Sequence, residues 1–162
     1  MPRRTPRTLA LEGFLPYRLA SLSQRISQAL SSIYREEFGI SVPEWRILAN
    51  LAEKGELNPS EIAAQTSMDR ARVTRGIKDL SAKRCVRKRR DEHDQRAYRL
   101  RLSPAGLALY RQIVPLALDW EAALLGSLGE AECRQFMRTL DTLSGHLDAA
   151  DQERSGNALG AR

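Results

Sequence analysis

The stretch Arg87–Gly106, RKRRDEHDQRAYRLRLSPAG, decides the fold. Seven of its first fifteen residues are Lys or Arg, and apolar and charged residues alternate strictly over Tyr98–Leu102. Period-two alternation predicts a half-buried strand, here with one apolar face and one arginine face. We expect the arginine face to need a partner outside the chain.

The residues before this strand predict a helix-turn-helix. NPSE (Asn58–Glu61) opens a short helix, and Asp69 caps a second helix with an apolar inner row. Strands near Cys85–Arg89 and over Tyr98–Leu102, with the loop Arg90–Ala97 between them, then form a hairpin. The predicted fold class is mainly α with a small β-hairpin wing.

Long amphipathic helices flank this segment on both sides. Apolar residues recur at steps of three and four from Pro16 to Phe38, and SVPE (Ser41–Glu44) is a capping box for the next helix. Ser103-Pro104 caps another long helix, and a final helix runs from Glu130 to Leu147. Pairing with a second copy would bury these apolar stripes, so we predict a homodimer.

These patterns give a domain organisation. We predict a flexible basic arm over 1–10, a single domain over 11–149 with dimerisation helices at 11–39 and 104–149 and a winged helix at 41–103, and a disordered tail over 150–162.

Positive charge is concentrated in the predicted winged helix. Residues 60–103 hold thirteen Lys or Arg and six Asp or Glu, a net charge of +7, whereas the rest of the chain carries −1. A basic block this localised is typical of a surface that binds a polyanion.

Other function classes find little support. Two cysteines and two histidines lack metal-ligand spacing, so we expect no metal, no cofactor and no redox sensing, and we interpret both cysteines as small buried side chains. No nucleophile–base pair or phosphate loop indicates an enzyme. Short apolar runs and the absence of a signal-peptide pattern predict a cytoplasmic protein without a membrane partner.

DQRAYRLRLSPAG (Asp94–Gly106) resembles the wing signature of the MarR family of bacterial transcriptional regulators. RVTRGIKDLSAKRCVRKR resembles the recognition helix of that family, and the likeness covers roughly Leu15–Leu147. It implies a homodimer on a palindromic operator, usually a repressor, with recognition helices in major grooves and wing tips in adjacent minor grooves. The family usually ends this helix with glycine, so Arg84 in that place is expected to take a left-handed conformation.

Side chains on the outward lines of the recognition helix and on the wing are the candidate DNA contacts. Arg96 suits the narrow minor groove, and the strand arginines suit phosphates. A solvated charged face is the alternative for the helix, and capping competes with phosphate binding at the two serines. The candidates are Ser60, Ser67, Arg70, Ala71, Thr74, Arg75, Lys78, Arg90, Arg96, Arg99 and Arg101.

GFLPYRLASLSQRIS (Gly13–Ser27) resembles a subgroup that controls catabolism of aromatic acids of the hydroxycinnamate type. Such regulators are released from DNA by aromatic acids or their coenzyme A thioesters, which bind between the dimerisation helices and the winged helix. Trp45 is alternatively a core residue, and the serines alternatively pack closely. Arg72 faces the DNA groove, turns inward beside Gly76, or pairs with Asp69 or Asp79. The candidate ligand residues are Tyr17, Arg18, Ser23, Ser27, Trp45 and Arg72.

The sequence therefore predicts a ligand-responsive DNA-binding regulator that binds a double-stranded operator, acts as a repressor and responds to a small-molecule inducer. The alternative is a winged helix that contacts an acidic protein partner without sequence-specific DNA binding. Only the first would show a steep salt dependence of duplex binding, because nucleic acid releases condensed counterions.

Overall fold

The computed structural model describes residues 8–90 and 98–159. The chain divides into two compact units, Met1–Leu118 and Asp119–Arg162. The single domain expected over 11–149 stays a prediction. The elements in chain order are the 3-10 helix η1 (Leu11–Gly13), α1 (Leu15–Glu36), α2 (Val42–Lys54), β1 (Glu56–Leu57), α3 (Pro59–Thr66), α4 (Arg70–Ala82), β2 (Val86–Arg90), β3 (Tyr98–Leu102), α5 (Pro104–Leu125) and α6 (Glu130–Leu159).

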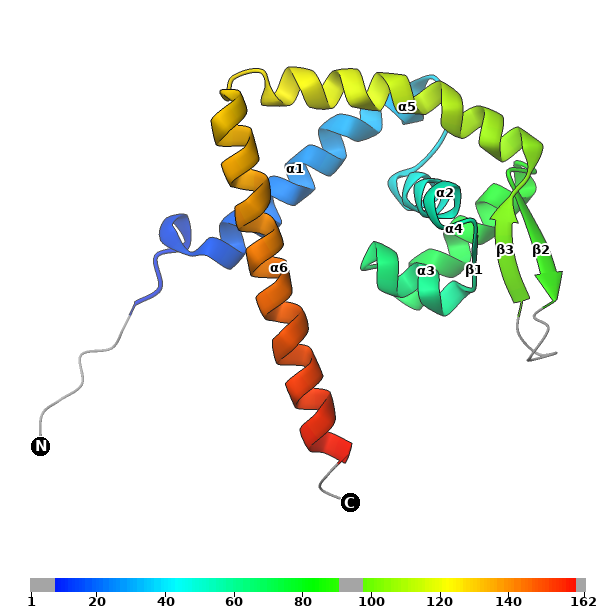
Figure 1. Ribbon diagram of the computed structural model, residues 1–162. Helices are drawn as coiled ribbons and strands as arrows, with labels where there is room; N and C mark the ends of the chain where they lie inside the picture. Colours follow the sequence, from blue (N-terminus) through cyan, green and yellow to red (C-terminus); the bar gives the residue numbers. More distant parts are fainter. Residues whose placement is uncertain (1–7, 91–97, 160–162) are drawn as a thin grey trace, which may run out of the picture. The chain divides into compact units, whose positions relative to one another are not determined.

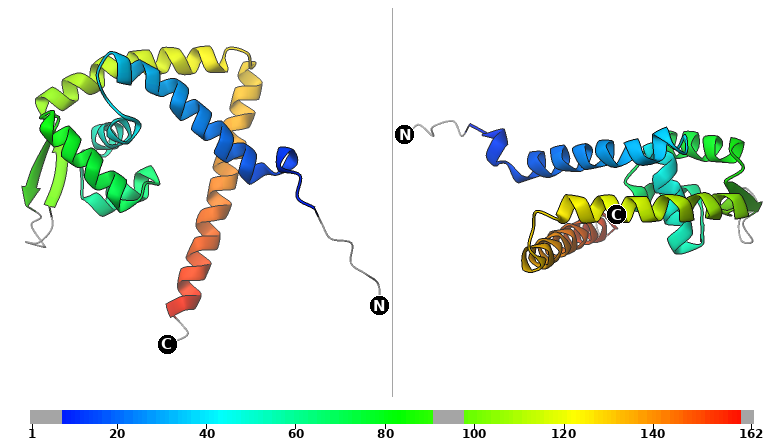
Figure 2. Two further views of the ribbon diagram at one scale, coloured as in Figure 1. Left: turned by 180° about the vertical axis from the view of Figure 1, so that it is seen from behind. Right: turned by 90° about the horizontal axis from the view of Figure 1, so that it is seen from above.

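A three-stranded antiparallel sheet in the order β1-β3-β2 forms the wing of the first unit. Helices α2, α3 and α4 lie on one side of this sheet (Figures 1 and 2). The fold class is confirmed, and β3 has its predicted bounds. Strand β1 was not predicted, because two residues are too short to show an alternation.

The core of the first unit lies between these helices and the apolar side of the sheet. Val73, Ile77 and Leu80, the predicted inner row of α4, are buried at 2% exposure or less, and Leu100 of β3 is fully buried. A Cβ added at Gly76 would lie 2.7 Å from Ile47 Cδ1. Gly76 therefore lets α4 approach α2 closely, which fixes α4 on the rest of the core.

Local capping sets where these helices begin. The Glu44 carboxylate accepts from the Ser41 backbone N–H at 2.8 Å, and the Asn58 side chain accepts from the Glu61 N–H at 2.9 Å. Asp69 accepts from the Arg72 N–H at 2.8 Å. These three caps confirm the predicted starts of α2, α3 and α4.

The turn from α4 into the wing is built around Arg84. Its φ of 57° confirms the left-handed conformation that was expected for this residue. The Ser103 hydroxyl donates to the Arg84 carbonyl at 2.6 Å and accepts from the Gly106 N–H at 3.0 Å. A Cβ at Gly106 would lie 2.0 Å from the Cys85 carbonyl oxygen. Only glycine fits there, so the start of α5 is held directly against the wing.

A half-buried ion pair links the same C-terminal end of α4 to the start of α2. Lys83 Nζ lies 2.7 Å from Glu44 Oε1, and the Glu44 side chain is only 4% exposed. Lys83 also donates to the Gly39 carbonyl. Burial raises the pKa of Glu44, but hydrogen bonds from Lys83 and Ser41 outweigh it, so the pKa is lowered. The carboxylate is therefore charged in the folded protein near neutral pH.

The second unit is helical. Helix α6 extends to Leu159, beyond Leu147, so the disorder predicted for 150–162 is wrong over residues 150–159. Extending an existing helix avoids the cost of nucleation, and this polar segment needs no packing partner to continue. The predicted arm over residues 1–7 and the tail residues 160–162 lie outside the described residues.

Apolar side chains on the second unit face solvent. None of the α6 side chains that the structure describes is buried, and Phe136, Met137 and Leu147 are 41%, 54% and 69% exposed. No helix among the described residues is both long enough and apolar enough to span a membrane. The apolar stripe of α6 is therefore exposed in the single chain.

Candidate DNA-binding surface and adjoining cavity

The outward face of α4 is a row of exposed side chains. All five candidates predicted there are exposed, namely Arg70, Ala71, Thr74, Arg75 and Lys78. Within residues 8–90 and 98–159, no acidic side chain forms an ion pair with Arg70, Arg75 or Lys78. The Thr74 hydroxyl donates to the Arg70 carbonyl at 2.8 Å. The helix thus presents three uncompensated cations to solvent.

The two serine candidates do not cap helices as expected. Ser60 follows Pro59 in the first turn of α3, where the cap is the Asn58 side chain. Ser67 is at the C-terminal end of α3 with a φ of 52°, so it does not start a helix. Both residues are exposed. Capping is therefore excluded for either hydroxyl, and phosphate contact stays a prediction for both.

On the wing, the candidate arginines fall into two groups. Arg90 ends β2 and Arg101 lies on β3, and both are exposed. Arg96 lies outside the described residues. Arg99 has partners within the chain, because its Nη2 donates to the Glu56 carbonyl at 2.8 Å and to Glu61 Oε2 at 3.2 Å. The expectation that this arginine needs an external partner is wrong.

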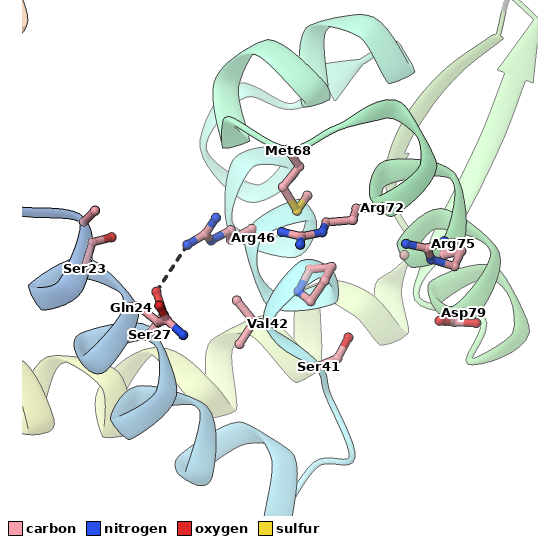
Figure 3. Close-up of a pocket in the computed structure, with 13 residues that line it drawn as sticks. Ser23, Gln24, Ser27, Ser41, Val42, Arg46, Met68, Arg72, Arg75 and Asp79 are labelled. Carbon is pink, nitrogen blue, oxygen red and sulfur yellow. Dashed lines mark hydrogen bonds between the residues drawn. The ribbon is translucent and has the colours of Figure 1, made fainter. Parts of the chain in front are cut away.

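Behind α4 lies a cavity of about 590 Å³, bounded by side chains from α1, α2 and α4 (Figure 3). Its polar lining includes three arginines and three serines, and its apolar lining includes one methionine. The lining residues are Ala20, Ser23, Gln24, Ser27, Ser41, Val42, Pro43, Arg46, Met68, Arg72, Arg75, Gly76 and Asp79.

Three guanidinium groups share this cavity. Arg46 and Arg72 extend from α2 and α4 toward the same space beside Met68 (Figure 3). Arg46 donates to Ser27 Oγ at 3.2 Å and to the Thr66 carbonyl at 3.4 Å, both neutral acceptors. Arg72 Nε lies 3.3 Å from Asp69 Oδ2 in an exposed i,i+3 pair. The cavity therefore carries an excess of positive charge beside an apolar wall.

Half of the predicted ligand residues line this cavity. Ser23, Ser27 and Arg72 line it. Arg72 also forms its ion pair with Asp69, so two of the three alternatives for this residue hold together. Tyr17 and Arg18 are exposed on α1 outside the lining.

Trp45, also proposed for the ligand, packs in the core. Its ring stacks on Tyr34 at 5.6 Å and on Tyr110 at 5.9 Å between centroids, and it does not line the cavity. The alternative role in the core is therefore correct for this residue, because aromatic partners from α1 and α5 occupy its faces.

Arg46 is the main cavity residue that the sequence interpretation missed. It is the one arginine in VPEWRILANLAEK, a helix that is otherwise mostly apolar. An arginine in such a setting was a signal that its charge has a dedicated partner. Arg75 was assigned to DNA alone, although it also lines the cavity.

The arrangement suits an anionic ligand with an apolar body. Guanidinium groups bind carboxylates and phosphates through paired N–H donors, and Met68, Val42 and Pro43 offer apolar contact. The volume lies within the roughly 300–1,000 Å³ of small-molecule sites. Arg72 and Arg75 lie on α4, so an anion here would contact the same helix that carries the exposed cationic row.

Comparisons with known proteins agree with this geometry. Residues 38–97 match the model of the MarR family. The HTH-type transcriptional regulator PecS of Dickeya dadantii (strain 3937) is 25% identical over 132 residues, which cover 80% of this chain and 79% of PecS. The solved MarR/EmrR family transcriptional regulator from Acinetobacter sp. ADP1 is 26% identical with a TM-score of 0.78, covering 87% of this chain and 99% of that one. Bordetella bronchiseptica BpsR, 24% identical with a TM-score of 0.67 over 78% of this chain and 98% of its own, shares the fold.

Proposed function

Because the chain belongs to the MarR family of transcriptional regulators, we propose that it binds an operator duplex as a homodimer, represses transcription there, and is released by an anionic aromatic ligand. Members of this family are regulators rather than enzymes, so the prediction that the chain is not an enzyme is confirmed.

The exposed cationic row of α4 is the observation that carries DNA binding. Arg70 and Ala71 lie in the first turn of the second helix of the helix-turn-helix, where such helices contact base edges. Lys78, about two turns further along the helix, supplies charge for a phosphate. Arg90 and Arg101 add exposed cations on the wing. Base contact is therefore assigned to the helix start and phosphate contact to the remaining cations.

Exposed apolar side chains support the homodimer. They lie near the start of α1, on the second half of α5 and along α6, which are the segments expected to dimerise. Large apolar side chains exposed along a helix are typical of an interaction surface. The exposed large apolar residues in these segments include Leu11, Phe14, Leu15, Leu116, Leu118, Leu124, Phe136, Met137 and Leu147.

The cavity supports an aromatic acid or its coenzyme A thioester as the ligand. A carboxylate or phosphate would pair with Arg46 and Arg72, and a ring would pack on Met68. Three arginines are more than one carboxylate needs. This favours a ligand with further acidic groups, such as the coenzyme A thioester, whose coenzyme A part carries phosphates. In the fold neighbour BpsR, 6-hydroxynicotinic acid regulates DNA binding.

Release of the operator would follow because the ligand and the DNA favour different positions of α4. An anion bound to Arg72 and Arg75 favours the α4 position that best closes the cavity, and DNA favours the position that fits two major grooves. The coupling between the two ligands equals this difference, typically about 1–3 kcal/mol. Ligand and operator would then each weaken the binding of the other by the same factor.

The DNA-binding part is tested by titrating a labelled random-sequence duplex and a duplex selected from a random library. Binding to the selected duplex is expected to be tighter, with a log–log salt slope of about −0.9 per phosphate contact. Failure to select any duplex, with weak binding and a shallow slope, would favour a protein partner instead.

The ligand part is tested by a thermal shift with 4-hydroxycinnamate, its coenzyme A thioester and free coenzyme A. Wild type is expected to be stabilised most by the thioester, and Arg46→Ala and Arg72→Ala are expected to lose that stabilisation while keeping the fold. Arg134→Ala, an equal change of charge on α6, is the matched control. No shift with any of the three compounds, or equal shifts in all variants, would contradict this site.

A further inference from the structure

On the strands that the structure describes, the outer face of the wing carries more arginines than carboxylates. In the antiparallel register of β2 and β3, Arg87 lies opposite Arg101 and Arg89 lies opposite Arg99. These four side chains therefore share one face of the sheet. Glu56 of β1 lies opposite Arg101 in the register of β1 and β3, so its side chain is on the same face of the sheet. Residues directly opposite in such a sheet have neighbouring side chains, and like charges there repel. Within strands β1, β2 and β3, one carboxylate therefore shares this face with four guanidinium groups.

Glu56 binds the two arginines nearest the wing loop. Arg89 approaches it with two donors, Nε to Oε1 at 3.3 Å and Nη2 to Oε2 at 3.0 Å. Arg99 Nε lies 3.7 Å from the same Oε2, while its Nη2 donates to the Glu56 carbonyl and to Glu61. The Glu56 and Arg99 side chains are each 27% exposed. A forked pair shared by two strands is ordered more firmly than a single surface pair.

The same network reaches the helix-turn-helix. Glu61 Oε2, which accepts from Arg99, also accepts from the Asn58 N–H at 2.7 Å as the capping box of α3. Arg99 thus joins the wing to the first turn of α3, whereas Arg101 on the same strand is exposed. Arg89 and Arg99 can reach a phosphate only by leaving these carboxylates.

We propose that Glu56 limits the sequence-independent affinity of the DNA-binding surface, because it holds Arg89 and Arg99 away from the phosphate backbone. The inference rests on the proposed DNA-binding function. Phosphate contacts add affinity for every sequence and carry no base information. Withholding two cations per protomer therefore lowers binding to every sequence by a similar factor, which reduces the fraction of protein held on the large excess of non-operator DNA.

Glu56→Gln tests this inference, since the amide keeps the shape but removes the charge that pairs with Arg89 and, together with Glu61, with Arg99. Its binding to a random-sequence duplex is expected to be about three- to tenfold tighter than wild type, with a steeper salt slope. The slope should steepen by about 0.9 for each additional phosphate that the variant neutralises, so by roughly 2 per protomer if both arginines engage. The affinity for the selected duplex should rise by a similar factor, so the ratio of the two affinities should stay near that of wild type.

Two further variants make the result decisive. Glu53→Gln changes the net charge equally, but Glu53 pairs with Lys54 and not with the wing arginines, so its slope should stay near wild type. Glu56→Gln combined with Arg89→Gln and Arg99→Gln should bind the random duplex no more tightly than wild type. Circular dichroism checks that all three variants are folded.

Weaker binding by Glu56→Gln, a change equal to that of Glu53→Gln, or tighter random-duplex binding that survives loss of both arginines would each overturn the proposal. Failure of wild type to bind the selected duplex would instead overturn the proposed function itself.

Discussion

The α4 face and the wing face are both rich in arginine, yet they differ in how that charge is compensated. Arg70 and Arg75 on α4 have no acidic partner among the described residues, whereas Arg89 and Arg99 on the wing are bound to Glu56. An unpartnered cation is available to DNA at no internal cost. A partnered one must first give up a hydrogen-bonded carboxylate. Local positive charge therefore identifies a DNA-binding region, but the ion pairs decide which side chains act in it.

The largest expected effect comes from the unpartnered face. Arg70→Ala should weaken binding to the selected duplex by about 1–3 kcal/mol, roughly 5- to 150-fold, as expected for loss of a base contact from the first turn of a recognition helix. Fluorescence anisotropy with the labelled duplex measures this loss. Arg134→Ala, which removes an exposed arginine paired with Glu130 on α6, serves as the control and should bind normally. Equal losses in both variants would mean that only net charge matters.

The sequence predicted where residues lie on this surface better than it predicted the hydrogen-bond partners of their side chains. The alternation over Tyr98–Leu102 identified the outer face of β3 from local backbone geometry. The left-handed Arg84 was expected from the resemblance to a family that usually has glycine at this position. The partners of Arg99 lie 43 and 38 residues away in the chain, so no local pattern reports them.

Trp45 and Arg46 show the same limit for the cavity. They are neighbours on α2, yet Trp45 packs between two tyrosines and Arg46 lines the cavity. Helical periodicity places adjacent residues on different faces, but it does not say which element each face meets. Assigning the two roles required the positions of α1, α4 and α5.

The ion pair between Glu44 and Lys83 should matter more for the stability of the fold than for DNA binding. Glu44→Gln should lower the free energy of unfolding near neutral pH by about 1–2 kcal/mol, less than for a fully buried pair, because Lys83 is 38% exposed. The pKa of Glu44 is lowered in the folded state. Its stabilisation is therefore present above the ordinary carboxyl pKa and is lost as the pH falls through the folded value.

Urea unfolding of wild type and Glu44→Gln from acid to neutral pH measures this. The two curves should differ near neutral pH and converge at the acid end. Glu130→Gln, whose side chain is 90% exposed, should follow wild type throughout. A constant difference between wild type and Glu44→Gln at every pH would show that the lost stability comes from packing rather than from the charge.

The smallest and most discriminating effect compares two arginines on one strand. Arg101→Ala and Arg99→Ala remove the same charge from β3 only two residues apart, but Arg101 is exposed and Arg99 is bound to Glu56 and Glu61. If Arg101 contacts a phosphate, its loss should reduce the log–log salt slope by about 0.9 per contact, roughly 2 for a dimer. Arg99→Ala should leave the slope unchanged, since that side chain is already occupied, and should cost a little stability through its lost hydrogen bonds. Titrations of the selected duplex at several salt concentrations give both slopes under the same conditions. Equal reductions in the two variants would show that DNA draws Arg99 away from its carboxylates, and the contrast between the wing and α4 would then hold only for the free protein.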